Sequence, residues 1–349
     1  AMIFGLVSLM FLDTSINMAM QPFKMMVGDM VNEKQKGLAY SIQSFLCNAG
    51  SLVGFLFPFI FTWIGISNIA PQGVVPDSVI YSFYIGAAIL ILCVIYTTVK
   101  VKEMPPAEYA EYHGITEEEE KEKINMVKLL IKAPKAFWTV GLVQFFCWFA
   151  FMFMWTYTNG SVAANVFDAP TVETAVNGVS KVMLDTKSIQ YQDAADWVGV
   201  LFAVQAIGSV LWAVCIPLFK DRKLIYSLSL VLGGLGFIST YFVHNQYVLF
   251  ISFLLIGCAW AAMLALPFTI LTNSLSGGHM GTYLGLFNGT ICIPQIVAAS
   301  LGGSILALFT PKGMLPPEIN MLVMAGVMLI IGAVCVYLIK ETKGEQTKA

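Results

Sequence analysis

Charged side chains are scarce in this sequence. Lys, Arg, Asp and Glu together make up 11% of its 349 residues, whereas soluble domains carry about 25%. Hydrophobic residues account for 58% of the chain, which is more than one soluble core could bury. The composition therefore excludes an ordinary soluble domain and predicts a protein whose solvent is the lipid bilayer.

The sequence also lacks the residues that several kinds of chemistry require. The three histidines, His113, His244 and His279, fall outside the apolar runs, and the seven cysteines lie singly in seven different runs, so neither a metal site nor a disulfide is expected. No phosphate-cradling loop, no nucleophile beside a base and no basic stripe with interleaved aromatics occurs. The first residues lack the charged region and cleavage pattern of a signal peptide. The sequence thus predicts that the protein is not an enzyme and binds no nucleic acid.

Nine stretches of the chain are long and apolar enough to cross a hydrocarbon core of about 30 Å, which takes roughly 20 helical residues. They are residues 2–30, 38–63, 79–99, 136–158, 197–219, 224–243, 247–271, 281–309 and 319–339. The predicted fold class is therefore an all-α membrane protein.

Two polar stretches divide these runs. Residues 100–135, which contain the acidic run Glu117 to Glu120, predict a cytoplasmic linker between three helices in residues 1–99 and six helices in residues 136–349. This division indicates two helical bundles of six, the first of them represented by its last three helices. The second polar stretch, 159–192, is expected to be an external, periplasmic loop with a solvated surface.

The 19 Lys and Arg residues are distributed unevenly between the loops. One side of the membrane receives Lys34, Lys36, the lysines from Lys100 to Lys135, Lys220, Arg222, Lys223, Lys340, Lys343 and Lys348. The other side receives Lys181, Lys187 and Lys312. Because cytoplasmic loops hold an excess of positive charge, the first span is predicted to run inward and the C-terminus to be cytoplasmic.

The first span holds two ionisable residues, Asp13 and Lys24, which are costly inside a membrane and so favour a functional role. Eleven helical positions bring them to within about 20° of one face, with Asn17 about 40° away. Desolvation favours the neutral form of an aspartate and access to water restores its charge, so Asp13 is predicted to carry a proton. A structural hydrogen bond is the alternative for Asp13, and a lysine that reaches the membrane interface is the alternative for Lys24.

The cytoplasmic end of the same span carries Asp29, which is predicted to pair with Lys34 or Lys36 in an inner gate. A helix-end charge that faces water is the alternative. Further along the chain, amides and indoles lie inside the spans, where each amide needs a hydrogen-bonding partner. These residues are Gln43, Asn48, Gln144, Gln205, Asn288 and Gln295, with Trp148 and Trp155. Apolar faces of a sugar pack on indole rings while its hydroxyl groups bind amides, so the set is typical of a sugar site. Hydrogen bonds between helices and ordinary packing are the alternatives.

Several motifs together resemble one family. They are Asp13 and Asn17 with Pro22-Phe23-Lys24 and Asp29; Gln144-Phe145-Phe146 with Trp148-Phe149; Ala195 to Phe202; Gly257 to Pro267; Met280-Gly281 to Asn288; and Ile293-Pro294-Gln295. Over nearly the whole chain this pattern resembles the sucrose and maltose proton symporters of the major facilitator superfamily, the bacterial members more than those of plants. Plant members carry aspartates where this chain has Trp155 and Tyr157.

The resemblance implies twelve helices, of which the first three are not in this sequence, and uptake of a disaccharide with a proton by alternating access. It implies that Asp13 accepts the proton and that Lys24 stands where arginine is usual. It also implies a monomer in a bacterial inner membrane, with no cofactor other than the coupling proton. Two rival functions remain: a sodium-coupled carrier of glycosides or uronic acids, and a sugar receptor that signals through residues 100–135 without transport.

Overall fold

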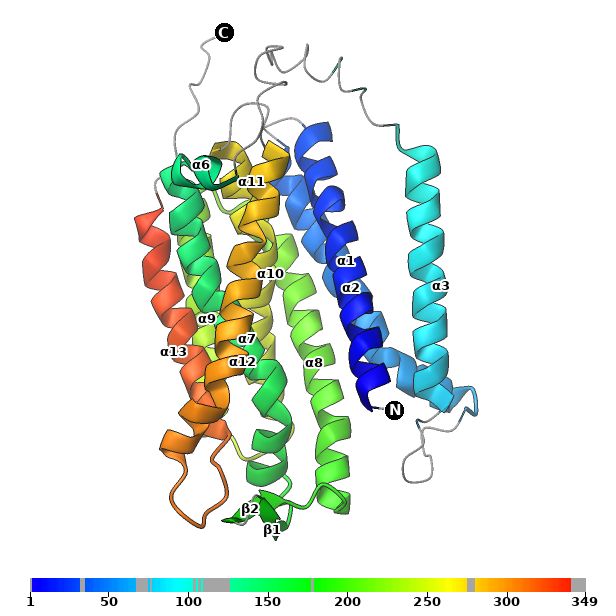
Figure 1. The fold of residues 1–349 in the computed structure, drawn as a ribbon, viewed down its shortest axis with the longest axis vertical. Coiled ribbons are helices and arrows are strands. Elements are labelled where there is room, and N and C mark those ends of the chain that lie inside the picture. Colours follow the sequence, from blue (N-terminus) through cyan, green and yellow to red (C-terminus); the bar gives the residue numbers. More distant parts are fainter. Residues whose placement is uncertain are drawn as a thin grey trace.

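The computed structural model of the chain describes residues 2–31, 35–66, 75, 77–102, 105, 108, 126–176, 179–274 and 280–339. Its long helices run side by side along one direction (Figure 1). We call the end of the molecule that carries the short helix α6 the α6 end, and the opposite end, which carries strands β1 and β2, the hairpin end.

The elements follow the chain in a simple order. They are α1 (Met2–Met30), α2 (Lys36–Trp63), α3 (Asp77–Lys100), α6 (Met126–Ile131), α7 (Lys135–Asn165), β1 (Thr171–Val176), β2 (Val179–Leu184), α8 (Ile189–Cys215), the 3-10 turn η1 (Ile216–Leu218), α9 (Arg222–Ser239), α10 (Leu249–Ser274), α11 (Met280–Phe287), α12 (Gly289–Phe309), α13 (Ile319–Cys335) and η2 (Val336–Leu338).

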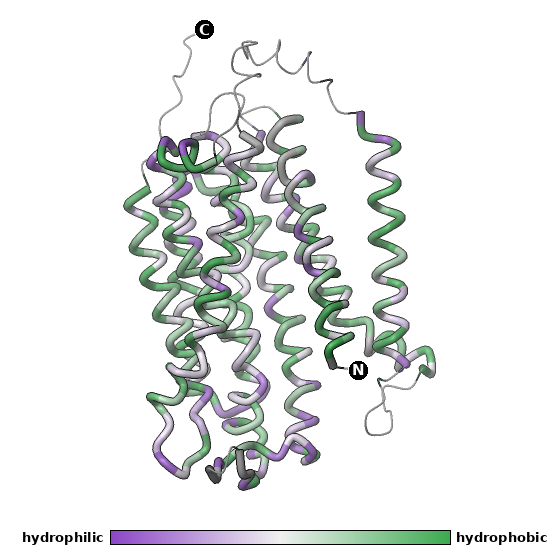
Figure 2. Tube along the Cα trace, in the orientation of Figure 1, coloured by the Kyte–Doolittle hydropathy of each residue, from purple (hydrophilic) through white to green (hydrophobic). Residues whose placement is uncertain are grey.

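The all-α membrane fold predicted from the apolar runs is confirmed. Eight helical segments of the described chain are long and apolar enough to cross a membrane. The remaining predicted span, α2, is a helix of 28 residues. Figure 2 shows the apolar residues concentrated along the shafts of the helices and the hydrophilic residues gathered mainly near both ends. Because a helix satisfies its own backbone hydrogen bonds, these segments can enter lipid without unpaired polar groups.

The predicted loop 159–192 differs from the structure. Its first residues continue α7 to Asn165, its last residues begin α8 at Ile189, and the middle forms an antiparallel hairpin in which Thr171 pairs with Leu184. Valine is frequent in both strands and threonine in β1, and β-branched residues favour extended backbone. The Ser188 hydroxyl accepts a hydrogen bond from the Tyr191 N–H at 3.3 Å and caps α8, as serine does at a helix start. The polarity of residues 159–192 therefore predicted a loop, but it did not predict the helix ends and the hairpin found there.

The described Lys and Arg residues are distributed unequally between the two ends of the molecule, as the charge pattern predicts. The cations that end or follow α3, lie in or after α6, begin α7, or lie at the start of α9 are on the side of the α6 end (Figure 1). They are Lys100, Lys102, Lys128, Lys132, Lys135, Lys220, Arg222 and Lys223. Lys181 in β2, Lys187 just before α8, and Lys312 between α12 and α13 belong to the hairpin end.

Helices α7 to α13 pack tightly, whereas α1 and α3 are left largely uncovered. In α7, 61% of the membrane-spanning window is buried, against none of Ile3–Met20 in α1 and 6% of α3. Helix α2 joins the N-terminal part to the bundle, since it packs along α8 and α10 and also contacts α1 and α3. Much of the apolar surface of α1 and α3 is thus available to lipid or to other helices.

Glycines allow the closest approaches within the bundle. A Cβ added at Gly326 of α13 would lie 2.6 Å from the carbonyl oxygen of Gly234 in α9, and one at Gly303 of α12 would meet nothing within 4 Å. We expect Gly326→Ala to lower the free energy of unfolding by about 1–3 kcal/mol, because the two backbones must separate. Gly303→Ala should be neutral or stabilising, since alanine favours helices. Thermal unfolding in detergent measures both, and equal midpoints for the two variants would contradict the packing described.

A buried carboxyl group joins α7 to α13 at the hairpin end. Glu318 directly precedes α13, and its carboxylate occupies the space where a Cβ at Gly160 of α7 would lie. Burial raises the pKa of Glu318 from its ordinary 4.5 to about 7. The folded protein therefore holds a proton that the unfolded chain releases, so stability should fall as pH rises from about 4.5 to about 7.

We expect the amide variant Glu318→Gln to lose this pH dependence, because it stays neutral throughout. Its unfolding midpoint should match that of the wild type near pH 4.5 and exceed it near pH 8. The matched control is Asp168→Asn, an exposed carboxylate at the same end whose φ of 48° suits asparagine. Midpoints of Glu318→Gln that fall with pH as steeply as those of the control would refute the assignment.

Candidate functional site

Three helices meet at one turn in the middle of α10. The Gln144 side chain of α7 donates a hydrogen bond from Nε2 to the Met263 carbonyl oxygen at 3.1 Å. From α2, the Ser44 hydroxyl donates to the Ala261 carbonyl oxygen at 3.3 Å. Trp260 begins this turn. We call Ser44, Asn48, Gln144, Trp148, Trp155 and Trp260 the central cluster.

The central cluster contains buried polar atoms with no hydrogen-bonding partner. Asn48 Oδ1, Gln144 Oε1 and Trp148 Nε1 are three of the six such side-chain atoms in the described residues. Leaving a buried polar group unpaired costs roughly 1–3 kcal/mol. Three such groups around one turn of α10 therefore favour a site where a ligand or ordered water supplies the missing partners.

Indole rings form one wall of the cluster. The centroid of Trp260 lies 5.7 Å from those of both Trp148 and Trp155, and the ring planes are nearly perpendicular. Trp148 is 9% exposed, whereas Trp155 is 44% exposed. Trp155 thus offers an exposed indole ring. The neighbouring Trp148 ring is buried, and its N–H has no protein partner. Flat apolar faces of this kind suit the apolar face of a sugar ring.

The structure brings some of the predicted residues together and leaves others apart. Asn48, Gln144, Trp148 and Trp155 meet at α10. Gln43 and Gln295 are partly buried on α2 and α12, and the described contacts do not join them to the central cluster. Trp260 was missed, although it lies within the apolar run that predicts α10. Only the way α7 packs on α10 brings it between two tryptophans, and no local pattern encodes that packing.

Helices α11 and α12 form one membrane-spanning segment, residues 282–309, as the predicted span 281–309 indicates. Asn288 lies between the two helices and has helical backbone angles, φ −59° and ψ −25°. The Asn288 amide nitrogen lies 3.8 Å from the Cys292 sulfur, while its Oδ1 is another buried atom without a partner. Asn288 thus places a further unpartnered amide oxygen in the first third of this segment.

Asp13 lies on α1. Asn17 Nδ2 donates to the Asp13 carbonyl oxygen at 2.9 Å and to Oδ1 at 3.2 Å. The expectation of a buried acid is wrong for the described chain, because few contacts cover α1 and the Asp13 side chain is exposed. The side chains of Lys24 and Asp29, and all of Lys34, lie outside the described residues.

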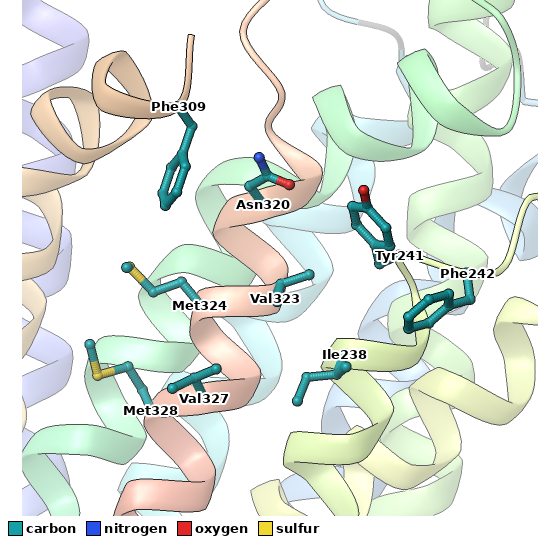
Figure 3. A pocket seen from close by; sticks show the side chains of 9 residues that line it. All are labelled: Ile238, Tyr241, Phe242, Phe309, Asn320, Val323, Met324, Val327 and Met328. Carbon is teal, nitrogen blue, oxygen red and sulfur yellow. The ribbon is translucent and has the colours of Figure 1, made fainter.

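A groove of about 510 Å³ lies away from these residues, between α9, α12 and α13. Figure 3 shows it lined by Phe309, by Ile238 of α9 with Tyr241 and Phe242 just beyond that helix, and by one face of α13. Asn320 and Tyr241 are its polar residues, and no carboxylate or cation is among the described residues that line it. Its apolar walls suit a hydrocarbon chain better than a sugar, so we do not assign the candidate site here.

The described residues thus include an exposed acid on α1, unpartnered amide oxygens on α2, α7 and α12, and indole rings on α7 and α10. Unpartnered polar atoms and indole faces of this kind can bind a polar solute between helices. A search of curated proteins finds no match. The sequence profile of the Major Facilitator Superfamily matches residues 3–184 and residues 162–349. These matches cover nearly the whole chain, which therefore belongs to the Major Facilitator Superfamily.

Proposed function

We propose that this secondary transporter takes up a disaccharide or α-glucoside together with a proton. The observation that carries the proposal is the set of buried, unpartnered polar atoms on Asn48, Gln144 and Trp148, which surround one turn of α10. Sugars supply many hydroxyl groups that could pair with these atoms, and an apolar ring face that could pack on the indoles.

In this proposal Asp13 carries the coupling proton. The Asn17 amide donates a hydrogen bond to the Asp13 Oδ1 at 3.2 Å. A neutral Asp13 would admit the sugar, and loss of the proton to the cytoplasm would favour release. Helices α1 and α2 would rock against α7, α10 and α12 around the bound sugar, as repeats of such transporters do.

We also propose that the α6 end faces the cytoplasm of a bacterial cell. The described cations concentrate at that end, and loops rich in Lys and Arg stay on the cytoplasmic side. Lys24, Asp29 and Lys34 keep their predicted roles at this end of α1 as part of the proposal.

The test is uptake by the full-length protein in liposomes, with maltose, sucrose and other α-glucosides in turn. We expect accumulation of at least one of them under an inward proton gradient, and none when a protonophore collapses that gradient. Accumulation that requires sodium and ignores the proton gradient would instead establish a sodium-coupled carrier. Binding of sugar without counterflow would indicate a receptor.

A further inference from the structure

A proline in α10 fixes the orientation of the Gln144 amide. Pro267 lies inside α10 and has no N–H, so the carbonyl group of Met263, four residues earlier, loses its helical partner. Gln144 Nε2 donates to that same carbonyl oxygen at 3.1 Å. A rotated amide would set Oε1 against the carbonyl oxygen, two acceptors facing each other, so only one orientation is favourable.

This orientation leaves Gln144 Oε1 as a buried acceptor without a partner. Asn48 repeats the arrangement, because its Nδ2 donates to the Ser44 carbonyl oxygen at 2.7 Å and its Oδ1 stays free. At Asn288, too, the nitrogen faces Cys292 and the oxygen has no partner. Three amides therefore direct their nitrogens to protein atoms and keep their oxygens available. The central cluster, which contains two of them, also holds the buried and unpartnered Trp148 N–H.

We propose that Pro267 is a positioning residue that makes the central site rich in acceptors, and that the site selects neutral, hydroxyl-rich substrates and rejects carboxylates. Hydroxyl groups can donate to the free amide oxygens of Gln144 and Asn48. A carboxylate would place its own acceptors against them, and such unpaired contacts are what discriminate between related ligands. This inference rests on the proposed function, since it concerns the substrate of the same site.

The first experiment compares maltose with its uronic acid analogue, in which a carboxylate replaces one hydroxymethyl group. Binding to the purified full-length protein is measured by titration calorimetry at neutral pH. We expect the acid to bind at least about 100-fold more weakly, because it leaves buried acceptors facing acceptors. Equal affinities would overturn the inference and keep the proposed function, whereas no binding of either compound would count against the proposed function.

The second experiment is a double-mutant cycle that needs no substrate. Gln144→Leu should lower the thermal midpoint of the wild type, because it leaves the Met263 carbonyl unpaired. In a Pro267→Ala background the backbone N–H returns, so Gln144→Leu should cost much less. Equal costs in the two backgrounds would show that Pro267 does not create the need for Gln144.

The binding readout then separates positioning from structure. Pro267→Ala frees the Gln144 amide to rotate, so we expect the uronic acid analogue to gain about tenfold in relative affinity over maltose. Pro294→Ala is the matched control, since Pro294 also lies inside a helix, α12, outside the central cluster. The same ratio of affinities in both variants would overturn the positioning role.

Discussion

Asp13→Asn should abolish accumulation of sugar against its gradient, with a loss of about 100-fold or more in the steady-state ratio of internal to external sugar. An asparagine cannot take up or release a proton, so a proton gradient can no longer drive the cycle. Sugar should still exchange across the membrane in counterflow, since a neutral side chain resembles the protonated acid and loading needs that state. The measurement is uptake of labelled sugar by the full-length protein in liposomes, with and without a pH gradient.

The control for this variant is Asp168→Asn, which makes the same chemical change on the exposed turn before β1. It should accumulate sugar like the wild type. Unchanged proton-driven accumulation by Asp13→Asn would remove Asp13 from the mechanism. A loss of both accumulation and counterflow, in a variant whose thermal midpoint is unchanged, would give Asp13 a role in binding and not in coupling.

The second of the two largest expected effects is that of Trp148→Ala, which should weaken sugar binding by about 30-fold to 100-fold. This substitution removes both a buried ring that packs on Trp260 and the one buried, unpartnered N–H of the central cluster. Trp148→Phe keeps most of the ring and loses only the N–H, so we expect a loss of about tenfold, the worth of one hydrogen bond to a buried group. Titration of the purified protein with sugar measures each dissociation constant.

Tryptophans elsewhere provide the comparison. Trp63 is 92% exposed at the hairpin end of α2, and Trp63→Ala should leave the affinity unchanged. Trp155→Ala should weaken binding less than Trp148→Ala, because Trp155 contributes a ring face but no buried unpaired atom. Normal affinity in both Trp148→Ala and Trp155→Ala would mean that the indoles serve packing alone.

The spans could be predicted from the sequence because lipid imposes one requirement, about 20 apolar residues without charge, that each segment meets alone. The expected boundaries of α1 and α2 agree with the structure within two residues. The hairpin at 171–184 was not predicted. Its strands lie in a polar segment, and they are stabilised by pairing with each other.

The site was predictable in its residue types and not in its arrangement. A side-chain amide inside a membrane span needs hydrogen-bonding partners, and this reasoning singled out Asn48 and Gln144. Each of them donates such a bond from its nitrogen and keeps an unpaired oxygen. Gln144 donates to the carbonyl oxygen that Pro267 leaves unpaired. This contact depends on how α7 packs on α10, because Gln144 and Met263 lie 119 positions apart in the sequence. The expected burial of Asp13 depended in the same way on neighbours of α1, which the sequence of α1 does not specify.

Coupling between sugar and proton can be observed directly with a pH electrode in a weakly buffered suspension of vesicles that contain the full-length protein facing outward. Addition of a transported α-glucoside, with no gradient imposed beforehand, should make the external medium transiently alkaline as protons enter with the sugar, and Asp13→Asn vesicles should show no such change. Sugar entry into wild-type vesicles without any change of external pH would contradict the account.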